Sequence, residues 1–348
     1  MWPISRQSSP KQFEPIVGEL STLQLAMERV APAYGYANIY VATNDRYSEI
    51  ILRQVPELSK NNIIFEPARR DLGPAVGLAM AHLAKEETND PVAILWSDNY
   101  IENNAAFSEL LAVAENLIID NKARIIFIGE TPRFANENLG WIGLGEQKGT
   151  VGDVPYFGFK SLTYRPPLER TREIFEQGSH VWNTGFFVTT PGYIQQLYKR
   201  FSPEMWRQLH EIELTIATEN YDETLARIYP EMQAISFDDA ILTHIDPDNA
   251  LVLHSEMGWS DPGTLYALKE AINPDPSINV TKGLVIDTES EDCLIYNYES
   301  GKLVMAVGLE GMIVVNTDDA ILVVHKDRIP LVKQVVNELQ DTDLESYS

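Results

Sequence analysis

The sequence predicts an α/β protein that carries a small β-rich domain at its C-terminal end. Strand-like and helix-like segments alternate along the first half of the chain, and this alternation is typical of a parallel sheet with helices on both faces. Residues 92–96 form a continuous apolar run, as expected for a strand that is buried on both sides, and RIIFIG at 124–129 is interpreted as a further buried strand. Residues 285–324 instead contain short β-rich segments separated by Gly, Asp and Asn.

Each element of the first half follows from the local sequence. Apolar residues at helical spacing predict a helix over 20–30, for which Ser21 is a suitable N-cap. Strands are expected at 38–43, 62–65, 92–96 and 124–129, and helices at 74–85 and 107–119. Ligands of such sheets bind at the carboxyl ends of the strands. The residues that follow the strands are therefore the ones to examine for function.

The second half is predicted to contain mixed structure and then a separate small domain. Helices are expected near 191–201, 203–217, 237–245 and 329–339. The segment 273–277, rich in Pro and Asp, indicates a domain boundary. We therefore predict one domain over 1–272 and a second over 273–348, a division that suits a chain of 348 residues.

Composition restricts the partners. The chain has 51 acidic and 27 basic residues and a formal net charge of −24, which argues against nucleic acid or an anionic membrane as a partner. A small anionic substrate remains compatible, because a few local Lys and Arg suffice to bind it. The single cysteine, Cys293, fits a reducing compartment. With neither a signal peptide nor an apolar run of about 20 residues, we expect a cytoplasmic protein.

The first 13 residues read MWPISRQSSPKQF. The strings WPISR and PKQF resemble the start of the mannose-1-phosphate guanylyltransferases, the family that makes GDP-mannose. In that family a strand and a glycine-rich phosphate loop, GGxGTRL, precede this motif, and Met1 stands where the last leucine of the loop would be. Because such a buried strand contributes on the order of 10 kcal/mol, we expect the true start codon to lie upstream of Met1.

Further motifs extend the resemblance in the family's order. EPARRDLGPA at 66–75 resembles EPxxRNTAPA, which implies that Glu66, Pro67 and Arg70 contact the nucleotide base. WSDNYI at 96–101 and GWSDPGTLYAL at 258–268 resemble the family's P-x-DH-x-I and GWSDvGsWxAL. The resemblance implies that Asp98 and Asp261 hold Mg²⁺, an ion that prefers oxygen ligands and phosphates. The structural alternatives are a turn residue for Asp98 and a helix cap for Asp261.

The remaining motifs imply phosphate and sugar contacts. Lys11 of PKQF would neutralise charge on the α-phosphate, and Arg6 of WPISR would bind substrate. Gly140 lies where the family has a loop along the sugar, and Asn183 of WNTGFF matches a sugar-contacting asparagine. Arg165 of LTYRP replaces the phosphate-binding lysine of the family's FxEKP, and the preceding tyrosine replaces its glutamate. SFDDA at 236–240 resembles SIDYAVME, where Asp238 could cap a helix, and VVNTDDAILV at 314–323 is interpreted as structural.

The resemblance covers the chain from Trp2 to about Leu339. It implies a Rossmann-like nucleotidyltransferase (nucleotide-diphospho-sugar transferase) sheet, a homodimer, and the conversion of GTP and mannose 1-phosphate to GDP-mannose and pyrophosphate with Mg²⁺. Two alternatives stay open. Tyr164, Asn99 and Leu72 depart from the family pattern and favour a related enzyme for another sugar 1-phosphate. The missing loop and the altered FxEKP motif favour a non-catalytic paralogue that binds nucleotide sugars.

Overall fold

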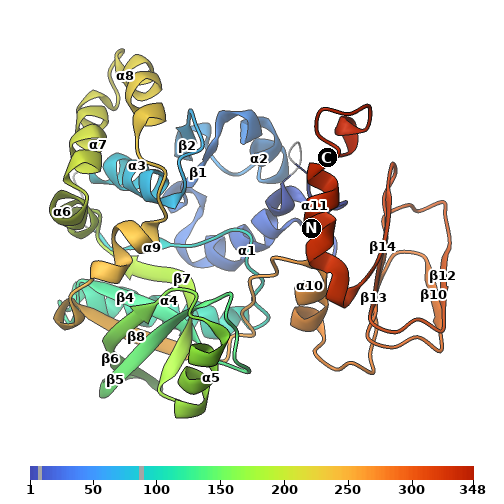
Figure 1. The fold of residues 1–348 in the computed structure, drawn as a ribbon. Helices are drawn as coiled ribbons and strands as arrows, with labels where there is room; N and C mark the ends of the chain where they lie inside the picture. The colour runs from blue at the N-terminus through green and yellow to red at the C-terminus, as the bar shows by residue number, and fades with distance from the viewer. Residues whose placement is uncertain (7–9, 86–89) are drawn as a thin grey trace. The chain divides into compact units, whose positions relative to one another are not determined.

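The computed structural model describes residues 1–6, 10–85 and 90–348. These residues form two compact units, each built from segments that are distant in sequence (Figure 1). The first unit contains Met1–Ala26, Ser97–Glu102 and Gly258–Ser348, and the second contains Met27–Trp96 and Asn103–Met257. The units are defined by contacts, and the predicted sequence domains 1–272 and 273–348 stay a prediction.

A six-stranded mixed sheet forms the centre of the second unit, in the order β3-β7-β4-β8-β6-β5. Its strands are β3 (Val92–Ile94), β4 (Ile125–Glu130), β5 (Gly140–Val151), β6 (Val154–Thr163), β7 (His180–Thr189) and β8 (Ala250–Ser255). β4 and β8 run parallel, whereas β7 is antiparallel to β3, β4 and β5, and β6 is antiparallel to β5 and β8. A separate parallel pair joins β1 (Val41–Asn44) to β2 (Ile63–Glu66).

The expectation of a parallel sheet is therefore wrong for most of these pairs. β5 and β6 are joined by a two-residue turn that starts at Gly152, whose φ of 58° suits glycine, and a turn this short forces the two strands to run antiparallel. The predicted buried strand at 92–96 is also shorter than expected, and Ala93 is exposed. β3 lies at the edge of the sheet, whereas all six residues of the more central β4 are buried, as predicted.

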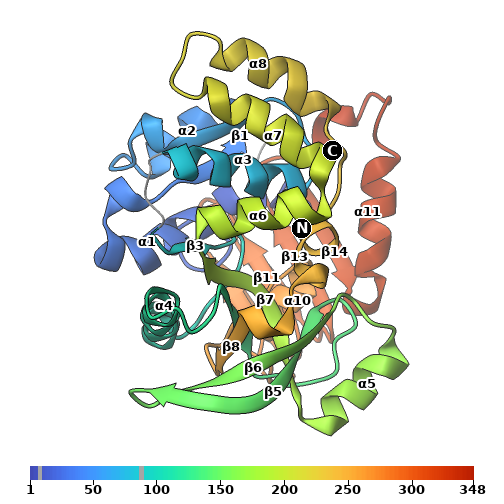
Figure 2. The ribbon, with the colours of Figure 1, turned by 90° about the vertical axis from the view of Figure 1, so that its left-hand side faces the viewer.

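Helices pack against this sheet (Figure 2). The second unit contains α2 (Ser48–Gln54), α3 (Leu72–Lys85), α4 (Asn104–Ile119), α5 (Leu168–Gln177), α6 (Pro191–Phe201), α7 (Pro203–Thr215), α8 (Tyr221–Ile228) and α9 (Phe237–Ala240). α3 packs on α6, α7 and α9, and Phe187 of β7 stacks on Phe237 with ring centroids 5.5 Å apart. The helix predicted over 237–245 is interrupted at Ile241, and a 3₁₀ turn at Leu242–His244 follows.

Helix α1 (Thr22–Tyr34) begins where the sequence predicts it. The Ser21 hydroxyl accepts a hydrogen bond from Gln24 N at 3.2 Å, and the Gln24 side chain accepts one from Ser21 N at 3.0 Å. This reciprocal pair is a capping box, which satisfies two backbone donors at the start of a helix. The prediction that Ser21 is the N-cap is confirmed.

The first unit contains the β-rich C-terminal region. β9 (Val280–Lys282), β11 (Leu294–Asn297), β13 (Met312–Asn316) and β14 (Ile321–His325) form one sheet, and β10 (Val285–Thr288) pairs in parallel with β12 (Val304–Val307). From β9 to β13, successive strands alternate between the two sheets, as in a coil. Helices α10 (Leu265–Ile272) and α11 (Ile329–Asn337) complete the unit. Its core includes Ile4 and Ile16 from the start of the chain, beside Leu294 and Ile313.

The small β-rich region at the C-terminal end is confirmed. None of the helices in the described ranges combines the length and the apolar character that crossing a bilayer requires.

Candidate active site

Lys11 lies between two carboxylates in the first unit. Its Nζ is 2.8 Å from Asp98 Oδ2 and 3.4 Å from Asp261 Oδ1. The three side chains are partly exposed, at 23%, 34% and 43% respectively. The structure thus brings together the three residues that the sequence predicts to be catalytic, although 250 positions separate Lys11 from Asp261.

Backbone pairing explains why the two carboxylates meet. Tyr100 and Ser260 form an antiparallel bridge, with both N–H···O=C hydrogen bonds at 3.0 Å. Next to the bridge, the Trp259 indole donates to Asn99 Oδ1 at 3.0 Å, and both side chains are buried. The family motif has histidine where this chain has Asn99, and here the asparagine anchors the segment that carries Asp98. The bridge holds the segments after residues 96 and 257 side by side.

The structural alternatives can now be compared with these contacts. The cap of α10 is Thr264, whose hydroxyl accepts from Ala267 N at 3.1 Å, so Asp261 is not the helix cap. Asp98 does lie in a turn, but its carboxylate faces Lys11. Both aspartates therefore present their carboxylates to the lysine.

The lysine and the carboxylates stabilise each other's charge. Burial lowers the pKa of Lys11, but the carboxylates of Asp98 and Asp261 outweigh burial and hold that pKa above its ordinary value. Two carboxylates also fit Mg²⁺, because their oxygens are hard ligands and phosphate and water complete the coordination of such an ion. No cluster of three or more candidate ligands occurs within residues 1–6, 10–85 and 90–348.

The predicted base-contacting residues lie at and after the end of β2, in the second unit. Glu66 Oε2 accepts a hydrogen bond from the Tyr229 hydroxyl at 2.6 Å. Burial raises the pKa of Glu66, and this hydrogen bond only partly opposes the rise. Pro67 is exposed, and the buried Nε of Arg70 has no hydrogen-bond partner. A buried guanidinium nitrogen without a partner is costly, and a bound ligand would relieve that cost.

Two of the predicted sugar contacts meet where β5 pairs with β7. Gly140 is opposite Asn183 in the register, and a Cβ on the glycine would lie 3.2 Å from the Cβ of Asn183. The Asn183 side chain accepts from Gly185 N at 3.0 Å and donates to Asp238 Oδ1 at 3.4 Å. Gly140 starts a strand, not the expected loop, and its lack of a side chain leaves room for the asparagine.

Arg165 follows β6 in a left-handed backbone conformation with a φ of 44°. Its guanidinium carbon lies 5.0 Å from the centroid of the Tyr164 ring. Burial raises the pKa of Asp238, and the positive charge of Arg165 partly opposes this rise. Asn183 and Arg165 thus both interact with the half-buried carboxylate of Asp238.

The sequence predicts only a capping role for Asp238. The actual cap of α9 is Ser236, whose hydroxyl accepts from Asp239 N at 3.0 Å. Asp239 in turn accepts from that hydroxyl at 2.7 Å. The signal was present in the string SFDD, because serine before the helix is as good a cap as aspartate and leaves the aspartate available.

Arg6 makes a two-pronged ion pair with Asp319, with N···O distances of 2.6 and 2.5 Å. Asp319 belongs to the motif VVNTDDAILV, so the pair ties the start of the chain to the loop between β13 and β14. Arg6 also lines a cavity of about 570 Å³ in the first unit, beside the start of α10 and the helix α11. Its predicted contact with substrate stays a prediction.

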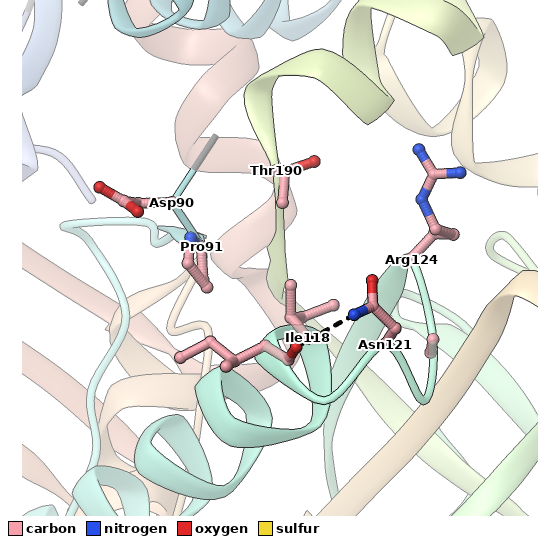
Figure 3. A pocket seen from close by; sticks show the side chains of 8 residues that line it. Asp90, Pro91, Ile118, Asn121, Arg124 and Thr190 are labelled. Carbon is pink, nitrogen blue, oxygen red and sulfur yellow. Dashed lines mark hydrogen bonds between the residues drawn. The ribbon is translucent and has the colours of Figure 1, made fainter. Parts of the chain in front are cut away.

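A smaller cavity of about 210 Å³ lies in the second unit (Figure 3). Its lining includes Asp90, Ile118, Asn121 and Arg124 and none of the predicted site residues. Pockets for small-molecule ligands are usually about 300–1,000 Å³, so we assign no substrate to this cavity.

Comparison with known proteins places this arrangement in a family. The profile of the nucleotidyl transferase family matches residues 1–277, and that of the mannose-phosphate isomerase/GMP-like β-helix domain matches residues 283–339. Mannose-1-phosphate guanylyltransferase RfbM of Salmonella typhimurium is 31% identical over 356 residues, which cover 100% of this chain and 71% of the relative. Alginate biosynthesis protein AlgA of Pseudomonas aeruginosa is 30% identical, covering 97% of this chain and 69% of that protein.

Solved structures share the fold. A Thermus thermophilus protein described as mannose-1-phosphate geranyltransferase superposes with a TM-score of 0.85 at 24% identity, over 98% of this chain and 95% of its own. Mannose-6-phosphate isomerase from Helicobacter pylori superposes with a TM-score of 0.59 at 17% identity, over 74% of this chain and 96% of its own. Fold and profile together define a nucleotidyltransferase, and the chain belongs to the nucleotidyl transferase family. Within it, the relatives that match along the whole of this chain are mannose-1-phosphate guanylyltransferases, and the chain is placed among them.

Proposed function

We propose that the protein transfers GMP from GTP to mannose 1-phosphate, giving GDP-mannose and pyrophosphate. The observation that carries this proposal is the position of Lys11 Nζ between Asp98 and Asp261. A cation and two potential metal ligands in one cluster suit a reaction in which negative charge accumulates on phosphate oxygens. The names of the relatives supply the choice of sugar and base.

The reaction is a single displacement at the α-phosphorus of GTP. An oxygen of the sugar phosphate forms a bond to that phosphorus while the bond to the leaving pyrophosphate breaks, without a covalent enzyme intermediate. Lys11 would stabilise the charge that develops on the α-phosphate oxygens. Asp98 and Asp261 would hold Mg²⁺, which supplies charge neutralisation at phosphate oxygens when it is bound.

We assign the other predicted residues to substrate binding. Gly140, Asn183 and Arg165 would contact mannose 1-phosphate, with the Arg165 guanidinium on the phosphate. The base of GTP would lie along Glu66, Pro67 and Arg70, and Arg6 would contact substrate in the first unit. We also propose that the protein acts as a homodimer in the cytoplasm.

The test is a turnover screen of mannose, glucose and fucose 1-phosphates against GTP and the other nucleoside triphosphates, with pyrophosphate release as the readout. We expect the highest kcat/KM for mannose 1-phosphate with GTP, and loss of turnover in Asp98→Asn. A higher kcat/KM for another pair would assign another substrate. If the chain bound GDP-mannose but released no pyrophosphate with any pair, the non-catalytic alternative would hold instead.

A further inference from the structure

Asp238 is a half-buried carboxylate for which folding gives no direct need. It lies in the single turn of α9, where Ser236 already caps the helix. The neighbouring Asp239 is exposed and accepts from the Ser236 hydroxyl, whereas Asp238 accepts from the side-chain amide of Asn183 at 3.4 Å. Burial of a carboxylate costs free energy unless other groups compensate it. The groups that compensate Asp238 therefore indicate what surrounds this carboxylate.

The groups around Asp238 belong to the predicted sugar site. Asn183 donates to it directly, and Gly140 gives that asparagine the room it needs. Arg165 and Tyr164 lie close enough for charge interactions with the carboxylate. An amide, a guanidinium and a phenol thus accompany one carboxylate, and groups of this kind bind a phosphorylated polyol.

The segment before Asp238 also touches the loop predicted to lie along the base. Ile235 O accepts a hydrogen bond from Gly73 N at 2.9 Å, and a Cβ on Gly73 would come within 2.7 Å of that oxygen. Asp71 of the same loop lies within the electrostatic reach of Asp238. The segment that carries Asp238 thus contacts residues 66–75 through Ile235, and Asp238 itself contacts the predicted sugar residue Asn183.

The departure in LTYRP leaves the sugar site with one carboxylate fewer than the family motif. The family motif FxEKP has a glutamate where this chain has Tyr164, and a phenol cannot supply the charged acceptor that a carboxylate supplies. We propose that Asp238 is the hydroxyl-binding carboxylate of the sugar site and determines which hexose 1-phosphate is accepted. This inference rests on the proposed function, and it assigns a specificity-determining role to a residue outside the metal site.

The test compares Asp238→Asn with Asp239→Asn. The two variants remove the same charge from adjacent positions of α9, but only Asp238 faces Asn183. We expect Asp238→Asn to raise the KM for mannose 1-phosphate by about tenfold to hundredfold, the range for a hydrogen bond to a charged group, with the KM for GTP within about twofold. Asp239→Asn should leave both KM values within about twofold. Equal KM values in the two variants would overturn the proposal.

Deoxy substrates distinguish the source of the hydroxyl. The penalty of Asp238→Asn should shrink with deoxymannose 1-phosphate that lacks the contacted hydroxyl, and it should persist with 2′-deoxy-GTP. The reverse pattern would assign Asp238 to the ribose and overturn the assignment to the hexose. Asp238→Ser, compared by thermal unfolding, provides a second variant if the asparagine form does not fold.

Failure of the inference can be separated from failure of the proposed function. Wild-type chain that makes GDP-mannose supports the proposed function whatever the variants do. If the wild type releases no pyrophosphate, calorimetric titration with GDP-mannose replaces kinetics. Weaker binding by Asp238→Asn than by Asp239→Asn would then support the inference, and equal binding would reject it.

Discussion

Lys11 is held by two opposite charges within the protein itself. Its ammonium is 2.8 Å from Asp98 and 3.4 Å from Asp261, and each of the three side chains keeps some contact with water. Such partly exposed pairs contribute little to stability, typically about 0–1 kcal/mol. The arrangement is therefore better explained by chemistry than by folding.

Replacing the lysine tests this directly. We expect Lys11→Met to lower kcat by about 10²–10³-fold, the usual effect of removing one preorganised charge donor from a transition state. The free energy of unfolding should change by less than about 1 kcal/mol, because the two ion pairs that are lost are partly exposed to water. Steady-state kinetics and urea unfolding provide the measurements, with exposed Lys60→Met as the control. Unchanged turnover in Lys11→Met would remove the lysine from the mechanism.

Glu66 predicts a specific dependence of stability on pH. Its pKa in the folded chain is raised above 4.5 by burial, so the folded state binds this proton more tightly than the unfolded state. The stabilisation is complete below about pH 4.5 and is lost as pH rises through the folded pKa. Because glutamine does not titrate, Glu66→Gln should gain stability relative to wild type across that interval.

Urea unfolding of both proteins at a series of pH values checks this. The difference between the two free energies of unfolding should change in favour of Glu66→Gln as pH increases. A difference that is flat with pH, or one that changes in the opposite direction, would show that burial does not govern this carboxyl.

At the scale of elements, different residues cap helix α10 and contact Lys11. Thr264 caps the helix, and Asp261 three residues earlier binds Lys11. Thr264→Ala should lose about 1 kcal/mol of stability and keep kcat within a few-fold. Asp261→Asn should do the reverse, with a small change in stability and a loss of turnover of at least about a hundredfold. Thermal unfolding and steady-state kinetics of both variants provide the measurements. If either variant lost both stability and turnover, capping and chemistry would not be divided between Thr264 and Asp261.

Several elements could be predicted from the sequence because local physics determines them. The capping box at Ser21 and the apolar run Ile125–Ile128 of β4 need no knowledge of the rest of the chain. Strand direction and edge position are different, because they depend on which strands pair. The run at 92–96 is apolar enough for a central strand, yet β3 has β7 as its neighbour at the edge of the sheet.

The candidate site was predictable to a similar extent. The motif order pointed to Lys11, Asp98 and Asp261, and the structure brings them together. Asp238 was predicted only as a helix cap. To choose between Ser236 and Asp238 as the cap, the first residue of the helix must be known, and the sequence does not define it to one residue. Arg6 illustrates the converse, since nothing in the local sequence reveals its ion pair with Asp319, 313 positions away.

At the scale of the whole molecule, the charge of −24 makes uncharged surface notable. One face of the β10–β12 pair is apolar and exposed. Side chains alternate along a strand, so Ala306 of β12 points to the core while Met305 and Val307 point away from it. This outer face consists of Leu284, Ile286, Leu303, Met305 and Val307, which are 47–63% exposed. Two copies repel least where neither carries charge, so we place the contact of the proposed homodimer here.

Met305→Glu should convert the dimer to a monomer, because it places a charge against its own copy across a symmetric interface. The matched control is Leu214→Glu in α7, which has the same exposed fraction of 63% and should remain dimeric. Sedimentation equilibrium of wild type and both variants gives the answer. A wild-type monomer, or a dimer in Met305→Glu, would contradict the assignment.

The caps at Ser236 and Thr264 have a consequence for how this protein can change. Because serine and threonine start α9 and α10, the helices do not depend on Asp238 or Asp261 for their formation. Substitutions at the two aspartates therefore leave the caps of both helices in place, so their proposed roles in substrate choice and reaction can be varied separately from folding. An engineer who seeks a new donor or acceptor can vary position 238 in a library without first stabilising the chain.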